Sequence, residues 1–103
     1  MDDFPFELNE KKTDPYKDQK LNNGDILRTF SKDVLSEELV WHRDKKTRVV
    51  KVLEGLGWEL QLDDKLPKPL EVGKSYTIPA YAFHRIKRGT TDLIVQIEEK
   101  DGI

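Results

Sequence analysis

The sequence predicts an all-β sandwich or barrel built as a single domain. After Gly24, short β-prone runs recur at close intervals, and turn-forming residues separate them. Only residues 32–38 have helical character, and after a capping Ser31 they suffice for one or two turns. A chain of 103 residues allows one modest core and no second functional module. Any active site must therefore lie inside that core.

The expected strands follow these runs in order along the chain. Each run is rich in aliphatic, aromatic or β-branched residues and ends at a cluster of glycine, aspartate, lysine or threonine. In the run at 58–62, Trp58 shares a face with Leu60 and Leu62, which predicts that this face packs in the core. We expect strands at residues 25–30, 39–43, 47–53, 58–62, 70–72, 75–78, 82–87 and 92–98.

The first 23 residues differ in composition from the rest of the chain. They are rich in aspartate, lysine, asparagine and glutamate and contain few large apolar residues, which is typical of a flexible arm. The alternation of Phe4, Phe6 and Leu8 also fits a strand that pairs with a sheet edge, in particular that of a second subunit. We therefore expect an arm at 1–23, a barrel at 24–103 and a homodimer.

Charge and composition exclude several classes of function. The net charge of −2 comes from balanced acids and bases, which predicts neither a nucleic acid nor a membrane as a partner. The chain has no cysteine, so disulfides and thiolate chemistry are excluded. No signal peptide or apolar membrane span is recognisable, and we expect a cytoplasmic protein.

The chain has two histidines, His42 and His84, in separate expected strands. Alternate residues of a strand face the same side, so His42 and Asp44 point together, and Arg48 keeps that parity if the turn between them does not shift it. Two imidazoles and one carboxylate are a minimal set for a divalent transition metal with open coordination positions. The sequence therefore contains a candidate metal site.

At this point the sequence resembles the cupins, small jelly-roll barrels with a metal site inside. Their first motif has glycine, HxH, glutamate and glycine at fixed spacings, and their second has glycine, PxG, histidine and asparagine. The first motif falls on Ser36, His42, Asp44, Arg48 and Gly55, and the second on Gly73, Pro79, Tyr81, His84 and Arg88. The resemblance spans residues 36–99 and implies a single-domain jelly-roll (cupin) β-barrel.

Two departures from the family pattern affect function. Asp44 replaces the second histidine and can still bind metal, whereas Arg48 replaces the glutamate and cannot. The remaining set, His42, Asp44 and His84, resembles the two-histidine, one-carboxylate triad that favours non-heme Fe(II), with Zn, Mn or Ni as other candidates. The resemblance thus implies a metal-dependent dioxygenase or hydroxylase.

Two arginines are candidate catalytic residues that anchor a small anionic substrate. Arg48 shares its parity with His42, and Arg88 shares its parity with Ile86 and His84. Inward-facing guanidiniums could hold a carboxylate or phosphate with paired hydrogen bonds. The alternative for Arg88 is a solvated strand end.

Other functions remain open at this stage. In a cupin without metal, Asp44 and Arg48 would form a salt bridge, and the barrel would be a non-catalytic small-ligand-binding module. A third hypothesis is an interaction protein that works through the N-terminal arm. The runs at 38–44, 58–64 and 83–85 also resemble small cupin-like proteins of tailed phages of marine bacteria, a likeness that implies no particular activity.

Overall fold

Strands dominate the computed structural model, which describes residues 15–100. The elements in chain order are β1 (Tyr16–Lys20), β2 (Ile26–Phe30), the 3-10 helix η2 (Ser36–Glu38), β3 (Thr47–Glu54), β4 (Glu59–Leu62), β5 (Lys68–Pro69), β6 (Ser75–Ile78), β7 (His84–Lys87) and β8 (Leu93–Lys100). This architecture confirms the predicted all-β class. None of the helices in residues 15–100 has the length and apolar character needed to cross a membrane.

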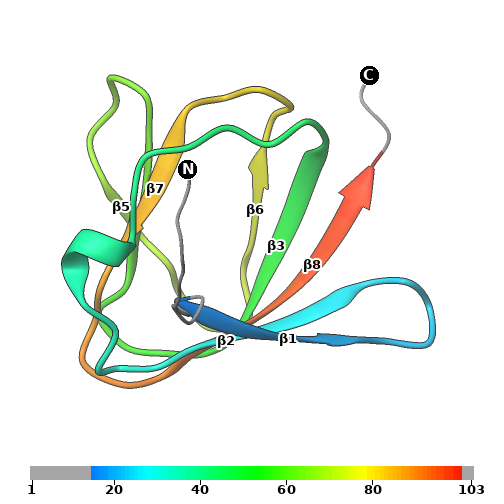
Figure 1. Ribbon diagram of the computed structural model, residues 1–103, viewed down its shortest axis with the longest axis horizontal. Coiled ribbons are helices and arrows are strands. Elements are labelled where there is room, and N and C mark those ends of the chain that lie inside the picture. The colour runs from blue at the N-terminus through cyan, green and yellow to red at the C-terminus, as the bar shows by residue number, and fades with distance from the viewer. Residues whose placement is uncertain (1–14, 101–103) are drawn as a thin grey trace, which may run out of the picture.

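The strands form two antiparallel sheets that face each other. The larger sheet has the order β1-β2-β8-β3-β6, and the smaller one has the order β5-β4-β7. In Figure 1, β5 and β7 lie on one side of the molecule, across from β6, β3 and β8, and β1 and β2 curve beneath. Two facing antiparallel sheets of this kind fit a jelly roll.

Alternation along the strands of the larger sheet directs apolar side chains between the two sheets. Leu93, Val95 and Ile97 of β8 are nearly inaccessible to solvent, and so is Val52 of β3. Val52 lies directly opposite Val95 in the register of β3 and β8. These side chains form much of the apolar interior between the sheets, and their burial is the main source of stability.

Trp58 is fully buried, as the sequence predicts. Its indole Nε1 donates a hydrogen bond to the Thr91 carbonyl at 2.6 Å, so the one polar atom of the ring has a partner. Phe30 lies beside it, with 5.8 Å between ring centroids. This aromatic pair anchors one end of the core.

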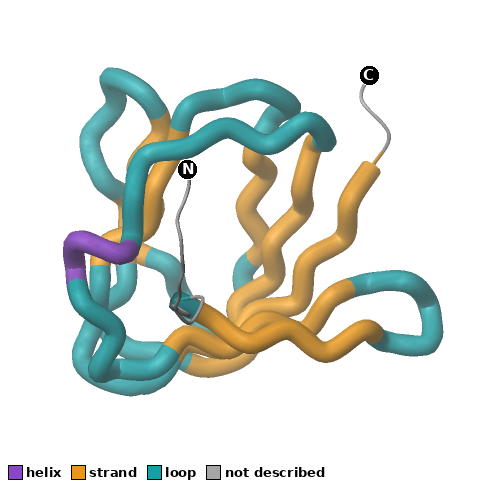
Figure 2. Tube along the Cα trace, in the orientation of Figure 1, coloured by secondary structure: helices purple, strands orange, loops and turns teal. Residues whose placement is uncertain are grey.

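Three segments differ from the elements expected. Residues 39–43 form no strand, and Figure 2 draws the segment between η2 and β3 as loop. Their bridge to another segment is the isolated one between His42 and His84. The helical segment shrinks to η2. Before it, the Ser31 hydroxyl accepts a hydrogen bond from the Asp33 amide in a tight turn. The strand expected at 70–72 lies two residues earlier, as β5, where Pro69 pairs with Glu59.

The structure also contains a strand that precedes the expected ones. β1 pairs with β2 at the edge of the larger sheet, with Asp18 opposite Arg28 and Tyr16 opposite Phe30. Its only large apolar residue is Tyr16, which is why the pattern of the sequence does not reveal it. Phe4, Phe6 and Leu8, on which the predicted edge-pairing arm depends, lie outside the described residues.

Candidate metal centre

His42 and His84 meet through their backbones. Each amide donates to the carbonyl of the other at 2.9 Å, which makes them a hydrogen-bonded antiparallel pair. Side chains of such a pair leave the backbone on the same face, and here the ring centroids are 4.3 Å apart. His84 begins β7, and His42 lies in the segment between η2 and β3.

Both imidazoles are oriented by a backbone carbonyl. Nδ1 of His42 lies 3.0 Å from the Val40 oxygen, and Nδ1 of His84 lies 2.9 Å from the Ala82 oxygen. A carbonyl can only accept, so Nδ1 carries the hydrogen in each ring and Nε2 is left with a free lone pair. This is the arrangement by which proteins prepare histidines for a metal ion.

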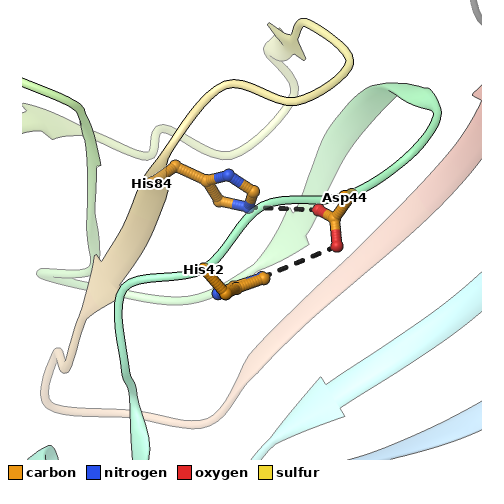
Figure 3. Close-up of side chains that lie close together, drawn as sticks. All are labelled: His42, Asp44 and His84. Carbon is orange, nitrogen blue, oxygen red and sulfur yellow. Dashed lines mark ion pairs between the residues drawn. The ribbon is translucent and has the colours of Figure 1, made fainter.

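Asp44 faces both Nε2 atoms from the loop that leads into β3. Its Oδ1 lies 3.8 Å from Nε2 of His42, and its Oδ2 lies 3.3 Å from Nε2 of His84. Figure 3 shows the three side chains converging on a common point. The Asp44 carbonyl accepts from the Tyr81 amide at 2.7 Å, which fixes this loop against the turn before β7.

The three side chains fit a metal ion in size and chemistry. One ligand atom from each lies within 4.8 Å of the others, so the group could hold a metal. Ligands bound at about 2.1 Å to one ion lie roughly 3.0 to 3.4 Å apart, and the Nε2 to carboxylate distances are near that range. Among residues 15–100, Asp44 Oδ2 is also a buried side-chain oxygen without a hydrogen bond, an acceptor that an ion would satisfy.

Burial lowers the pKa of the His84 imidazole below its ordinary value. The charges of His42 and Arg48 lower it further, while the hydrogen bond to Ala82 and the carboxylate of Asp44 act in the opposite direction. His84 is consequently neutral at pH 7, which is the form that binds metal.

Arg48 lies beside the candidate site and contacts its carboxylate. Nη1 is 3.2 Å from Asp44 Oδ2, while Nε and Nη2 donate to Glu99 Oε2 at 3.1 and 2.8 Å. Arg48 is opposite Glu99 in the register of β3 and β8, and its side chain is 17% exposed. The structure therefore brings Arg48 to the site together with the three candidate ligands.

Arg88 does not join them. β7 ends at Lys87, and beyond this end the alternation that placed Arg88 with His84 and Ile86 no longer applies. Its Nη1 donates to the Val34 carbonyl at 2.9 Å, so Arg88 ties two connecting segments together. It is not among the residues that line the interior cavity.

A cavity of about 320 Å³ opens next to the candidate ligands, between the two sheets. A site for a small molecule is usually about 300–1,000 Å³ in volume and mostly apolar, and this cavity is at the lower end of that range. Its lining includes His42, Asp44, His84 and Arg48, and it also includes Arg28, which the sequence analysis missed. One feature of the sequence could have indicated this: Arg28 lies between Ile26 and Phe30, on the same face of an expected strand.

Comparison with known proteins supports the fold. No protein family model matches the chain, and no curated protein sequence is similar to it. Among solved structures, a protein from Ralstonia eutropha JMP134 proposed to be a mannose-6-phosphate isomerase has a TM-score of 0.64 at 16% identity, covering 84% of this chain and 83% of that one.

Two further structures are similar. A cupin domain from Bordetella pertussis Tohama I has a TM-score of 0.59 at 20% identity and covers 88% of this chain and 99% of its own. A protein from Neisseria meningitidis has a TM-score of 0.59 at 17% identity, with 88% and 89% covered. At such identities the likeness shows the fold alone, and this chain has the fold of a cupin domain.

Proposed function

We propose that this cupin-fold chain is a metal-dependent enzyme of the dioxygenase or hydroxylase type that acts on a small anionic substrate. The observation that carries the proposal is the orientation of the two histidines. Both Nδ1 atoms are engaged by backbone carbonyls, and both Nε2 atoms face the Asp44 carboxylate. A purely structural pair of histidines has no need of this arrangement.

The donor set supports Fe(II) over other ions. Two imidazoles and one carboxylate on one side of an ion form the facial triad typical of non-heme Fe(II) oxygenases. When bound, such an ion would supply open coordination positions at the cavity for oxygen or substrate. The chain itself holds the three ligands in place and keeps His84 neutral through burial. The cavity beside the ligands is lined mostly by apolar side chains.

Arg48 is one residue that we assign to the anionic group of the substrate. It lines the cavity, is largely buried and lies next to the candidate ligands. A guanidinium that is fixed by Glu99 on a neighbouring strand is already oriented before a ligand arrives, which reduces the entropic cost of binding.

Metal analysis tests the proposal. Protein purified without chelator should contain about one transition-metal ion per chain, and His42→Ala, Asp44→Ala and His84→Ala should each lose it. Asp33→Ala, at an exposed aspartate paired with Lys32, is the matched control and should retain the metal. Loaded with Fe(II), the protein should consume oxygen only when a suitable carboxylate is present. Absence of metal, or equal metal in wild type and Asp44→Ala, would refute the proposal.

A second candidate function is a non-catalytic ligand-binding module without metal. The contact of 3.2 Å between Arg48 and Asp44 favours it, because the guanidinium already neutralises the carboxylate that would bind the ion. In that case a ligand would bind equally well with and without EDTA. The metal-dependent enzyme requires the opposite result.

A further inference from the structure

The inner wall of the cavity holds a second fixed guanidinium, that of Arg28. It is buried and lies directly opposite Asp18 in the register of β1 and β2. Nε donates to Asp18 Oδ1 at 2.8 Å, and Nη2 donates to Oδ2 at 2.9 Å. The guanidinium carbon is 3.7 Å from the centroid of the Tyr16 ring. This paired hydrogen bonding and stacking hold the group rigidly.

Two of the three nitrogens of that guanidinium have partners in these contacts. Among the described residues, no hydrogen bond uses the third nitrogen of Arg28, Nη1. Burial lowers the pKa of Arg28, but the hydrogen bonds to Asp18 and the charges of Tyr16, Asp18 and Asp44 outweigh it, so the net shift is upward. A buried cation with a spare donor is a strong site for an anion.

The formal charges of the cavity do not balance. Among residues 15–100, two guanidiniums and four carboxylates line it or pair with a lining side chain: Arg28, Arg48, Asp18, Glu38, Asp44 and Glu99. Arg28 pairs with Asp18, and Arg48 is shared between Glu99 and Asp44, so the carboxylates outnumber the guanidiniums by two. Among these six side chains negative charge therefore exceeds positive charge, and a divalent cation would offset the excess.

The rest of the lining is apolar. It consists of aliphatic and aromatic side chains, including Phe30, Leu39, Val50, Leu60, Leu70, Ile78, Ile86, Leu93, Val95 and Ile97. A water molecule in the liquid takes up about 30 Å³, so a cavity of this volume admits roughly ten water-sized groups. A ligand that fills it must present an apolar body of about that size.

We propose that the cavity binds a small monocarboxylate with an apolar body, that Arg28 Nη1 donates to its carboxylate, and that a bound metal ion strengthens this binding. This inference rests on the proposed metal site and extends it to a class of ligand. Because the metal offsets the excess negative charge, metal and carboxylate bind cooperatively, and each raises the affinity for the other by the same factor.

Calorimetry with three probes of one apolar body tests this. Octanoate, 1-octanol and octylamine are titrated into metal-free and Zn²⁺-loaded protein, zinc being chosen because it is not redox-active. Zinc should strengthen octanoate binding by about tenfold or more, leave octanol nearly unchanged and weaken octylamine. Acetate, which lacks the apolar body, should bind far more weakly than octanoate. Equal octanoate affinity in both forms, or acetate as tight as octanoate, would overturn the proposal.

Variants test the role of Arg28. In zinc-loaded Arg28→Met, octanoate should bind about tenfold more weakly while octanol keeps its affinity. Arg28→Met leaves the Asp18 carboxylate without its partner. The double variant Asp18→Asn, Arg28→Met removes that carboxylate as well and should show the same selective loss of octanoate binding. Lys51→Met makes the same charge change on the exposed face of β3 and should bind both probes like wild type. An equal loss for octanol and octanoate would reduce Arg28 to a structural role and overturn the assignment.

A separate zinc titration distinguishes the two proposals. If the protein binds no zinc, the proposed function fails, and the predicted effect of metal on octanoate binding fails with it. If zinc binds but octanoate shows no dependence on it, the metal site stands and only the ligand assignment is wrong.

Discussion

Arg48 and Asp44 are held 3.2 Å apart from two different parts of the fold. Arg48 is in β3 of the larger sheet, whereas the backbone of Asp44 is fixed to Tyr81, in the turn before β7 of the smaller sheet. Their contact connects the two sheets beside the candidate ligands. The same carboxylate oxygen cannot be fully available to an ion while the guanidinium is next to it.

Replacing Arg48 should therefore increase metal affinity. Arg48→Met removes a positive charge close to the ion and frees Asp44, so zinc should bind about tenfold more tightly or better in a calorimetric titration. Glu99→Gln should have the opposite effect, because Arg48 loses its other partner and interacts more strongly with Asp44. Unchanged zinc affinity in Arg48→Met would mean that the contact has no influence on the metal.

The metal-free protein should lose stability in mild acid. The folded-state pKa of His84 is lowered, so below the ordinary histidine pKa of about 6.5 the unfolded chain takes up a proton that the folded chain refuses. The free energy of unfolding should thus fall as the pH drops from about 6.5 toward the lowered pKa. Urea unfolding across this range measures the slope, and His84→Asn should lack this contribution. An identical slope in the variant would exclude His84 as its source.

Tyr81 is a site where substitution should stabilise the fold. It has φ of 64°, a left-handed conformation that costs a residue with a side chain about 1–2 kcal/mol, and 63% of it is exposed. Tyr81→Gly removes that strain but increases the entropy of the unfolded chain. We expect a net gain of roughly 0.5–1 kcal/mol in chemical denaturation. Tyr81→Ala keeps the strain and should show no gain, and a clear loss of stability in Tyr81→Gly would contradict this reasoning.

Gly89 should tolerate no side chain. A Cβ at this position would overlap the Leu56 carbonyl oxygen and would lie 2.5 Å from Cδ1 and 2.7 Å from the amide nitrogen of Trp58. Gly89→Ala should cost about 3 kcal/mol or more, since both backbones and the buried indole would have to move. Gly73→Ala is the control: its φ is 89° but a Cβ meets nothing within 4 Å, so only about 1–2 kcal/mol is expected. Equal costs would show that crowding at Gly89 is relieved.

The sequence predicts the all-β fold because several of its strands are recognisable from their own residues. The runs that became β3, β6, β7 and β8 have clear apolar alternation and turn residues at both ends. β1 gives no such signal, since it is an edge strand of mostly exposed residues whose Asp18 pairs with a partner ten residues away, Arg28. Such a pairing becomes visible only when the register is known.

The candidate site shows the same limit. His42 and Asp44 are two residues apart, and His84 is placed by the family spacing, so these three could be grouped before the structure was known. Strand alternation did not place Arg88 beside His84 because β7 ends at Lys87, just before it. Arg28 was overlooked because a charged residue inside an apolar run looks like an interruption of the core, when it is in fact part of the cavity wall.

The attachment of residues 41–44 has a consequence for motion. Trp41 stacks on Phe83, His42 pairs with His84, and the Asp44 carbonyl accepts from Tyr81, so the segment is fastened to one side of the interior at three successive points. If the two sheets spread slightly to admit a ligand, both imidazoles and the Asp44 loop would travel together as a rigid body. Arg48 would stay behind with β3, and the gap opened by that separation would lie between Arg48 and Asp44.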